Sequence, residues 1–364
     1  MGLPLVRCLR TQVITACVII LAAASLVAAR DVHAAAQRTF VASLGTDSNP
    51  CSLALPCRSF AAAAAQTNAG GEIIVVDSAG YGTVALTNSI SIVAPPGVYA
   101  GITVSAGDGV SIAGSGLTVK IRGLTLSGPL TSIGVRAETT NSSIEVTDCV
   151  FGTFGNAVFV YGMGNYLAAT RLTIAGAASG LHVAGGASAA ITGVNIRESL
   201  FAAIEFIGGA TLDVSDSTFS RNNVGIVVSA PDSLPVRADI LRVAISGGDE
   251  GINLLASSPA LLSATVDRVS VAGSANVGIG TRCLLGGSIK LSVTDSTISD
   301  IPSDLGAIRN NDAGCEVVAG RNTVVRSKVA FVNLAPGTFV SFGNNQLAQN
   351  TTDSVGTIGP GTLH

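Results

Sequence analysis

Two residues that could transfer a proton follow the same short motif in successive segments of the chain. His182 and Glu205 each come directly after a dipeptide of one small and one apolar residue. A carboxylate beside an imidazole orients the ring and supports general acid–base chemistry. On an exposed sheet, the same two residues form only a cross-strand polar contact. His182 and Glu205 are therefore the candidate catalytic residues, with the polar contact as the alternative.

A second candidate site contains two carboxylates, Asp213 and Asp239, with Arg237 on the same outward face. Carboxylates about 5 Å apart on neighbouring strands hold a hard cation, or act as acid and nucleophile on a glycosidic bond. The alternative is that they are two solvated carboxylates whose negative charge Arg237 partly neutralises. Calcium takes roughly six to eight oxygen ligands, so no metal site is predicted. These three residues are candidate binding residues, together with Arg136 and Tyr161.

Aromatic side chains and cofactor motifs are scarce. The chain has no Trp and four Tyr, although sugar-binding grooves commonly use flat aromatic platforms. Tyr161 and Tyr166 bracket one loop, either as a small platform or as loop packing. We find no zinc spacing, phosphate-binding loop or Ser-His-Asp arrangement. The sequence therefore predicts no cofactor.

The candidate residues recur because the chain is a repeat. Strand-like pieces end at positions separated by 23, 22, 23, 26, 26 and 27 residues, and these positions are Phe151, Ile174, Ile196, Phe219, Ile245, Val271 and Ile298. Each period holds three short strands, too short for independent hairpins. Such a period is one coil of a parallel β-solenoid, which predicts an all-β fold of roughly eleven coils in residues 72–342.

One column of residues lies at a corner of this solenoid, just before the first strand of each repeat. Its members are Asp148, Arg171, Gly193, Asp216, Arg242, Arg268, Asp295 and Arg321. Stacked coils place neighbours ~4.8 Å apart, so we expect Asp216 to pair with Arg242 and Arg268 with Asp295. The column is either a charged binding stripe or, as we favour, a corner ladder whose pairs each contribute ~0–1 kcal/mol.

The ends of a solenoid expose strand edges that need covers. Residues 59–66 are predicted as a short helix, with Ser59 as N-cap and Phe60 as its apolar anchor. The predicted organisation is a signal peptide (1–36), a disulfide loop with a helix cap (37–71), the β-helix (72–342) and a C-terminal cover (343–364).

The N-terminus has the order of a secretory signal. Arg7 and Arg10 precede the apolar residues 13–29, and small residues follow up to Ala36. This order predicts cleavage after Ala36, or otherwise after Ala29, and an uncleaved anchor helix is the alternative. The protein is thus expected to be secreted or periplasmic, with no membrane span after cleavage.

Five cysteines remain after cleavage, and an oxidising compartment favours disulfides. Cys51 and Cys57 lie in a proline-bounded loop and are expected to pair, with a metal site as the alternative. Cys283 and Cys315 fall in loops of neighbouring coils, where a disulfide is slightly favoured over two free thiols. Cys149 occupies an inward position and is expected to act as a small hydrophobe.

Composition excludes several classes of protein. The 364 residues are 48% hydrophobic and 12% charged, with 43 glycines and a net charge of -3. Disordered chains combine low hydrophobicity with high net charge, which this chain does not do. Nucleic-acid binders carry a basic face, whereas this chain has 20 Lys and Arg residues and 23 Asp and Glu residues. A solenoid explains the high hydrophobic fraction and the many glycines, because aliphatic rows fill its interior and glycines form its corners.

The N-terminal region also carries specific motifs. They are Thr39-Phe40-Val41-Ala42-Ser43, Gly45-Thr46-Asp47-Ser48-Asn49-Pro50-Cys51, Pro56-Cys57-Arg58-Ser59-Phe60, Gly71-Glu72-Ile73 and Gly80-Tyr81-Gly82. With them the chain resembles, over residues 38–350, the bacterial secreted right-handed parallel β-helix repeat proteins of the pectin-lyase-like superfamily. The resemblance implies a right-handed helix with an N-terminal cap. Lyases, hydrolases and adhesins share this repeat, so it does not imply an enzyme.

The sequence therefore favours a secreted, non-catalytic β-helix scaffold or binding protein, with a polysaccharide or a cell-surface protein as its partner. The alternative is a polysaccharide lyase or glycoside hydrolase with an atypical site near His182 and Glu205. No nucleic-acid partner is predicted, and the sequence does not specify an oligomeric state.

Overall fold

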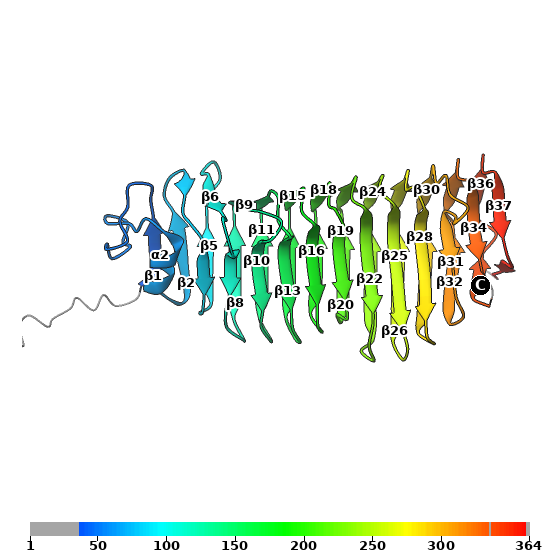
Figure 1. The fold of residues 1–364 in the computed structure, drawn as a ribbon, viewed down its shortest axis with the longest axis horizontal. Coiled ribbons are helices and arrows are strands. Elements are labelled where there is room, and N and C mark those ends of the chain that lie inside the picture. Colours follow the sequence, from blue (N-terminus) through cyan, green and yellow to red (C-terminus); the bar gives the residue numbers. More distant parts are fainter. Residues whose placement is uncertain (1–35, 335, 362–364) are drawn as a thin grey trace, which may run out of the picture. The chain divides into compact units, whose positions relative to one another are not determined.

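The computed structural model describes residues 36–334 and 336–361. They form a right-handed parallel β-helix, in which the chain passes through three sheets in turn and each strand pairs with its counterpart one coil later (Figure 1). Three sheets and about eleven coils confirm the fold class predicted from the repeat. Residues 1–35 of the predicted signal peptide lie outside the described residues.

The three sheets are named here in the order in which the chain meets them. Sheet A contains β1 (Ala36–Val41), β2 (Thr67–Val75), β5 (Ile90–Val93), β8 (Thr118–Arg122), β11 (Ser143–Thr147), β14 (Tyr166–Thr170), β17 (Ser188–Thr192), β20 (Thr211–Ser215), β23 (Val236–Leu241), β26 (Leu261–Asp267), β29 (Ser288–Thr294), β32 (Cys315–Gly320), β35 (Thr338–Ser341) and β38 (Gly359–Pro360). Sheet B contains β3 (Ala79–Gly80), β6 (Ala100–Thr103), β9 (Leu124–Ser127), β12 (Val150–Phe151), β15 (Thr173–Ala175), β18 (Asn195–Arg197), β21 (Thr218–Ser220), β24 (Ala244–Ser246), β27 (Ser270–Ala272), β30 (Thr297–Ser299), β33 (Thr323–Val325) and β36 (Gln346–Ala348). Sheet C contains β4 (Val84–Leu86), β7 (Asp108–Ile112), β10 (Ile133–Glu138), β13 (Asn156–Tyr161), β16 (Ser179–Ala184), β19 (Ala202–Ile207), β22 (Val224–Ala230), β25 (Glu250–Ser257), β28 (Val277–Leu284), β31 (Ile308–Asn310), β34 (Val329–Asn333) and β37 (Thr352–Val355).

Strand alternation separates the core from the surface. In β23, Val236, Ala238 and Ile240 are buried, whereas Arg237 between them is exposed. Each inward residue stacks on its counterpart in the next coil, as Ala238 does on Ala264. This stacking gives every coil a continuous aliphatic interior and leaves alternate side chains of each sheet free for contacts outside it.

The corner between sheets A and B carries the predicted ladder. Its non-glycine members have φ between +50° and +57°, a left-handed conformation that is rare for residues other than glycine. Arg242 donates from Nε and Nη2 to Asp216 at 2.6 and 2.7 Å, as expected. Arg171 forms the same two-point pair with Asp148. In both pairs an acid is bound by the arginine of the next coil in the column, so the corner forms a ladder of exposed ion pairs.

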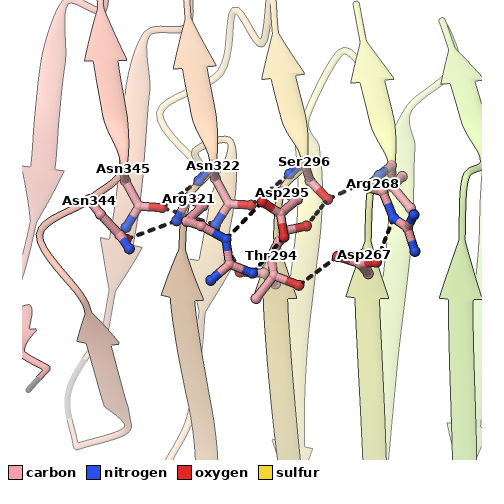
Figure 2. A network of polar contacts seen from close by, with 11 residues as sticks. Asp267, Arg268, Thr294, Asp295, Ser296, Arg321, Asn322, Asn344 and Asn345 are labelled. Atoms are coloured by element: carbon pink, nitrogen blue, oxygen red, sulfur yellow. Dashed lines mark hydrogen bonds and ion pairs between the residues drawn. The ribbon is translucent and has the colours of Figure 1, made fainter. Parts of the chain in front are cut away.

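One expected pair of the ladder is different in the structure. Asp295 accepts from Nε and Nη2 of Arg321 at 2.8 and 2.6 Å, while Arg268 donates to Asp267 at 2.9 Å. Figure 2 shows this part of the ladder, with Thr294 bridging to Asp267. Arg321 takes the carboxylate because both guanidinium nitrogens reach it, and this contact lowers the pKa of Asp295.

The N-terminal end is covered as predicted. Helix α2 (Phe60–Gln66) is capped by Ser59, whose Oγ accepts from the Ala62 backbone N–H at 3.2 Å. Phe60 is fully buried, with its ring 5.3 Å from that of Tyr81. No helix among the residues described is long and apolar enough to cross a membrane.

Both predicted disulfides are present, Cys51–Cys57 and Cys283–Cys315. The second one joins the end of β28 in sheet C to the start of β32 in sheet A, in the following coil. Cys149 is a buried free thiol, and burial raises its pKa to about 11. It therefore packs as a small apolar group and is not a nucleophile at neutral pH.

Candidate functional site

An outward column of sheet C brings three of the candidate residues, together with Phe159, into register. Arg136 of β10 pairs with Phe159 of β13, which pairs with His182 of β16, which pairs with Glu205 of β19. One coil separates each residue from the next, or about 4.8 Å. The sequence motif thus positions His182 beside Glu205 because both occupy the same place in adjacent coils.

His182 and Glu205 form a hydrogen-bonded pair that includes a third residue. His182 Nδ1 lies 3.0 Å from Glu205 Oε2, and Ser179 Oγ donates to the same oxygen at 2.7 Å. The His182 contact, assisted by Ser179 and opposed by partial burial, lowers the pKa of Glu205. Glu205 is therefore an ionised acceptor near neutral pH and is poorly suited to act as a general acid.

A hollow of about 460 Å³ lies beside this pair. It is lined by Gly155, Asn156, Ala178, Ser179, His182, Phe201 and Glu205. Phe201 stands directly before β19 with 61% of its surface exposed. The small residues Gly155 and Ala178 of the two preceding coils also line the hollow. This site is called the Phe201 hollow below. The exposed Phe201 ring lines it together with the polar pair His182 and Glu205.

The two binding candidates on sheet C, Arg136 and Tyr161, both lie against the Phe159 ring. Arg136 donates to Asp108 at 2.7 Å, also contacts Glu138, and stands 5.7 Å from the centre of the Phe159 ring. Tyr161 is 52% exposed, and its ring is nearly parallel to that of Phe159 at 6.4 Å. Arg136 therefore supports the aromatic group, whereas Tyr161 remains open to a ligand.

The carboxylate candidates lie on a different sheet. Asp213 of β20 pairs in register with Asp239 of β23, and Arg237 donates to Asp239 Oδ2 at 2.9 and 2.6 Å. Partial desolvation and the charge of Asp239 raise the pKa of Asp213. Arg237 and Asp239 line a hollow of about 470 Å³. Asp213 thus lies beside a second carboxylate, whereas Asp239 binds a guanidinium group.

Within the described ranges, no three His, Cys, Asp or Glu residues form a group that could hold a metal ion. Sequence reasoning missed Ser179 and Phe201. The available signal was the exposed pair Leu200-Phe201, which stands at a corner where the preceding coil has Ala177-Ala178. The preceding coil has two alanines at these positions, and more than half of each of the Leu200 and Phe201 side chains is exposed, so the core does not require these large apolar residues.

No protein-family model matches the chain, and no curated protein is similar to it in sequence. A GH136 lacto-N-biosidase from Eubacterium ramulus is similar in structure, with a TM-score of 0.51 and 10% identity over 89% of this chain and 68% of that one. An alginate lyase from Paenibacillus sp. str. FPU-7 has a TM-score of 0.46 and 14% identity, covering 89% of this chain and 100% of that one. Pectate lyase Pel9A has a TM-score of 0.41 and 16% identity, covering 87% of this chain and 78% of that one.

Identities this low establish similarity of fold and not of activity. The parallel strands, the three sheets and the helical cap agree with the sequence resemblance. The chain therefore has the right-handed parallel β-helix fold of the pectin-lyase-like proteins.

Proposed function

We propose that the protein is a secreted, non-catalytic binding protein that recognises a glycan through the Phe201 hollow. The observation that carries this proposal is the exposed Phe201 ring beside the Ser179–Glu205–His182 hydrogen bonds. A sugar ring presents C–H groups that pack on an aromatic face and hydroxyls that bond to fixed polar groups. The hollow offers both kinds of contact on one side of the β-helix.

Binding fits this hollow better than hydrolysis does. Glycoside hydrolysis typically uses two carboxyl groups, one of them protonated. Glu205 is the one carboxylate among the lining residues, and its neighbours favour its ionised form. Ser179 and His182 both point at the same oxygen, so the network is arranged to hold a fixed acceptor. The two disulfides support export, because they persist in oxidising compartments.

Replacing Phe201 by alanine is expected to weaken glycan binding about tenfold, because the ring's apolar contact with the sugar is lost. A glycan array identifies the ligand, and titration calorimetry then gives the dissociation constant. Glu205→Gln is expected to weaken binding to a similar degree, since it removes the charged acceptor.

The matched control is Leu200→Ala, which removes a neighbouring side chain that is 57% exposed and does not line the hollow. Leu200→Ala should bind like the unaltered protein. Equal binding by Phe201→Ala, Glu205→Gln and Leu200→Ala would show that the glycan binds elsewhere.

A second candidate function is glycoside hydrolysis on sheet A. It is favoured by the raised pKa of Asp213 beside the Arg237-bound Asp239. If this function is correct, the protein is expected to release reducing ends from members of a polysaccharide panel. Either Asp213→Asn or Asp239→Asn is then expected to remove the activity. Unsaturated-uronate absorbance would instead indicate a lyase. A panel without either product, using protein that still binds glycan, excludes this candidate and leaves the binding proposal intact.

A further inference from the structure

A separate hollow lies further along sheet C. In the outward column that holds His182 and Glu205, the later members are Asn253 of β25, Gly280 of β28 and Arg309 of β31. Gly280 is four coils beyond His182, which corresponds to about 19 Å. The residues around Gly280 enclose a hollow of about 140 Å³. This site, called the Gly280 hollow, shares no lining residue with the Phe201 hollow.

The glycine provides the space in this hollow. A Cβ on Gly280 would contact only Val277 Cγ1, at 3.1 Å, and the φ of Gly280 lies outside the left-handed region. The backbone therefore does not require glycine here. Other coils carry a side chain at this position, as Arg136, Phe159 and Asn253 show. The missing side chain leaves an opening between Asn253 and Arg309.

An arginine that forms no ion-pair contact with the described residues lines this opening. Most arginines that the structure describes form ion pairs, but no carboxylate within the described ranges pairs with Arg309 or Arg282, both of which line the hollow. Arg309 donates from Nε and Nη2 to the neutral Asn311 Oδ1, at 3.1 and 2.7 Å. Its remaining edge, made by Nη1 and the second Nη2 proton, has no acceptor among the described residues.

The surroundings make the unpaired charge costly. Burial and the nearby Arg282 lower the pKa of Arg309, and the attraction of Glu250 and Asp312 only partly opposes this shift. The environment therefore disfavours, on balance, the charged form that a guanidinium nevertheless keeps. Glu250 also lines the hollow and attracts both arginines without an ion-pair contact, and its carboxylate accepts from Asn253 Nδ2 at 2.5 Å. A partly buried cation gains most from an anion that enters its site.

We propose that the Gly280 hollow binds a carboxylate or sulfate group of a small ligand, held by the free guanidinium edge of Arg309 and by Arg282. The planar fork of a guanidinium binds two oxygens of one oxyanion. A volume of about 140 Å³ suits a single group of this size. The site does not depend on glycan binding at the Phe201 hollow.

Titration calorimetry at constant ionic strength tests this site with acetate, sulfate and glucuronate, and with glucose as the neutral control. The three anions are expected to saturate one site in the millimolar range or below, and glucose is not. Acetate and sulfate as tight as glucuronate would identify a free anion as the ligand. Tighter glucuronate would identify an acidic group carried on a sugar.

Two variants remove the site by different means. Arg309→Gln removes the charge and is expected to weaken anion binding about tenfold or more. Gly280→Leu fills the opening, keeps both arginines and should have the same effect. Arg326→Gln is the matched control, because Arg326 is an exposed arginine paired with Asp300 outside the hollow. Circular dichroism confirms that each variant is folded. Unsaturable binding to the unaltered protein, or full binding by both folded site variants, would overturn the proposal.

Discussion

Replacing both Cys283 and Cys315 by alanine is expected to lower the free energy of unfolding by about 4 kcal/mol. The disulfide spans 32 residues, and closing a loop of that length removes entropy from the unfolded chain worth roughly this amount. It links the end of β28 in sheet C to the start of β32 in sheet A, across the corner between these two sheets. Denaturant unfolding of the oxidised proteins measures the change.

The other cysteines provide the controls for this experiment. Cys149→Ala removes one buried sulfur without removing a cross-link, so it is expected to cost only about 1 kcal/mol. Breaking Cys51–Cys57, which spans six residues, should cost about 2 kcal/mol because the loop is shorter. A Cys283/Cys315 double variant as stable as Cys149→Ala would mean that stacking alone fixes the two coils.

The coil register could be predicted from the sequence because the core imposes it. Phe151, Ile174 and Ile196 recur as the buried residue of a sheet B strand in three coils and pair directly in the structure. A slip by one residue would expose each of these side chains, so the hydrophobic pattern has a single solution. The contact between His182 and Glu205 followed from the same register.

Contacts that depend on side-chain reach were less predictable. Asp295 lies between Arg268 and Arg321 in the corner column, and only the geometry of the two guanidinium groups assigns it to Arg321. Phe201 and the Gly280 hollow belong to corners and outward positions, where the core places no constraint on residue type. At both sites the sequence departs from the residue type found in other coils. Whether this change creates a hollow depends on the side chains of the adjacent coils.

Replacing Gly251 by valine is expected to lower the free energy of unfolding by about 3 kcal/mol. Gly251 belongs to the small-apolar motif that recurs in sheet C, in register with Gly225 and Gly278. A Cβ on Gly251 would lie 2.4 Å from the Gly278 carbonyl oxygen and 2.5 Å from Val271 Cγ1. Both neighbours are held by the next coil, so relief of the clash must widen the spacing between coils.

The small residue in this motif is therefore a packing requirement, and a matched glycine tests the distinction. Gly152 lies directly after β12, and the nearest atom to a Cβ there is Ser127 Cβ at 3.5 Å, an ordinary contact distance. Gly152→Val should change the free energy of unfolding by no more than about 0.5 kcal/mol. Denaturant unfolding of both variants compares them directly. If Gly251→Val were as stable as Gly152→Val, the coils would be able to separate at little cost, and the close contact at Gly278 would not explain why the repeat keeps a small residue in sheet C.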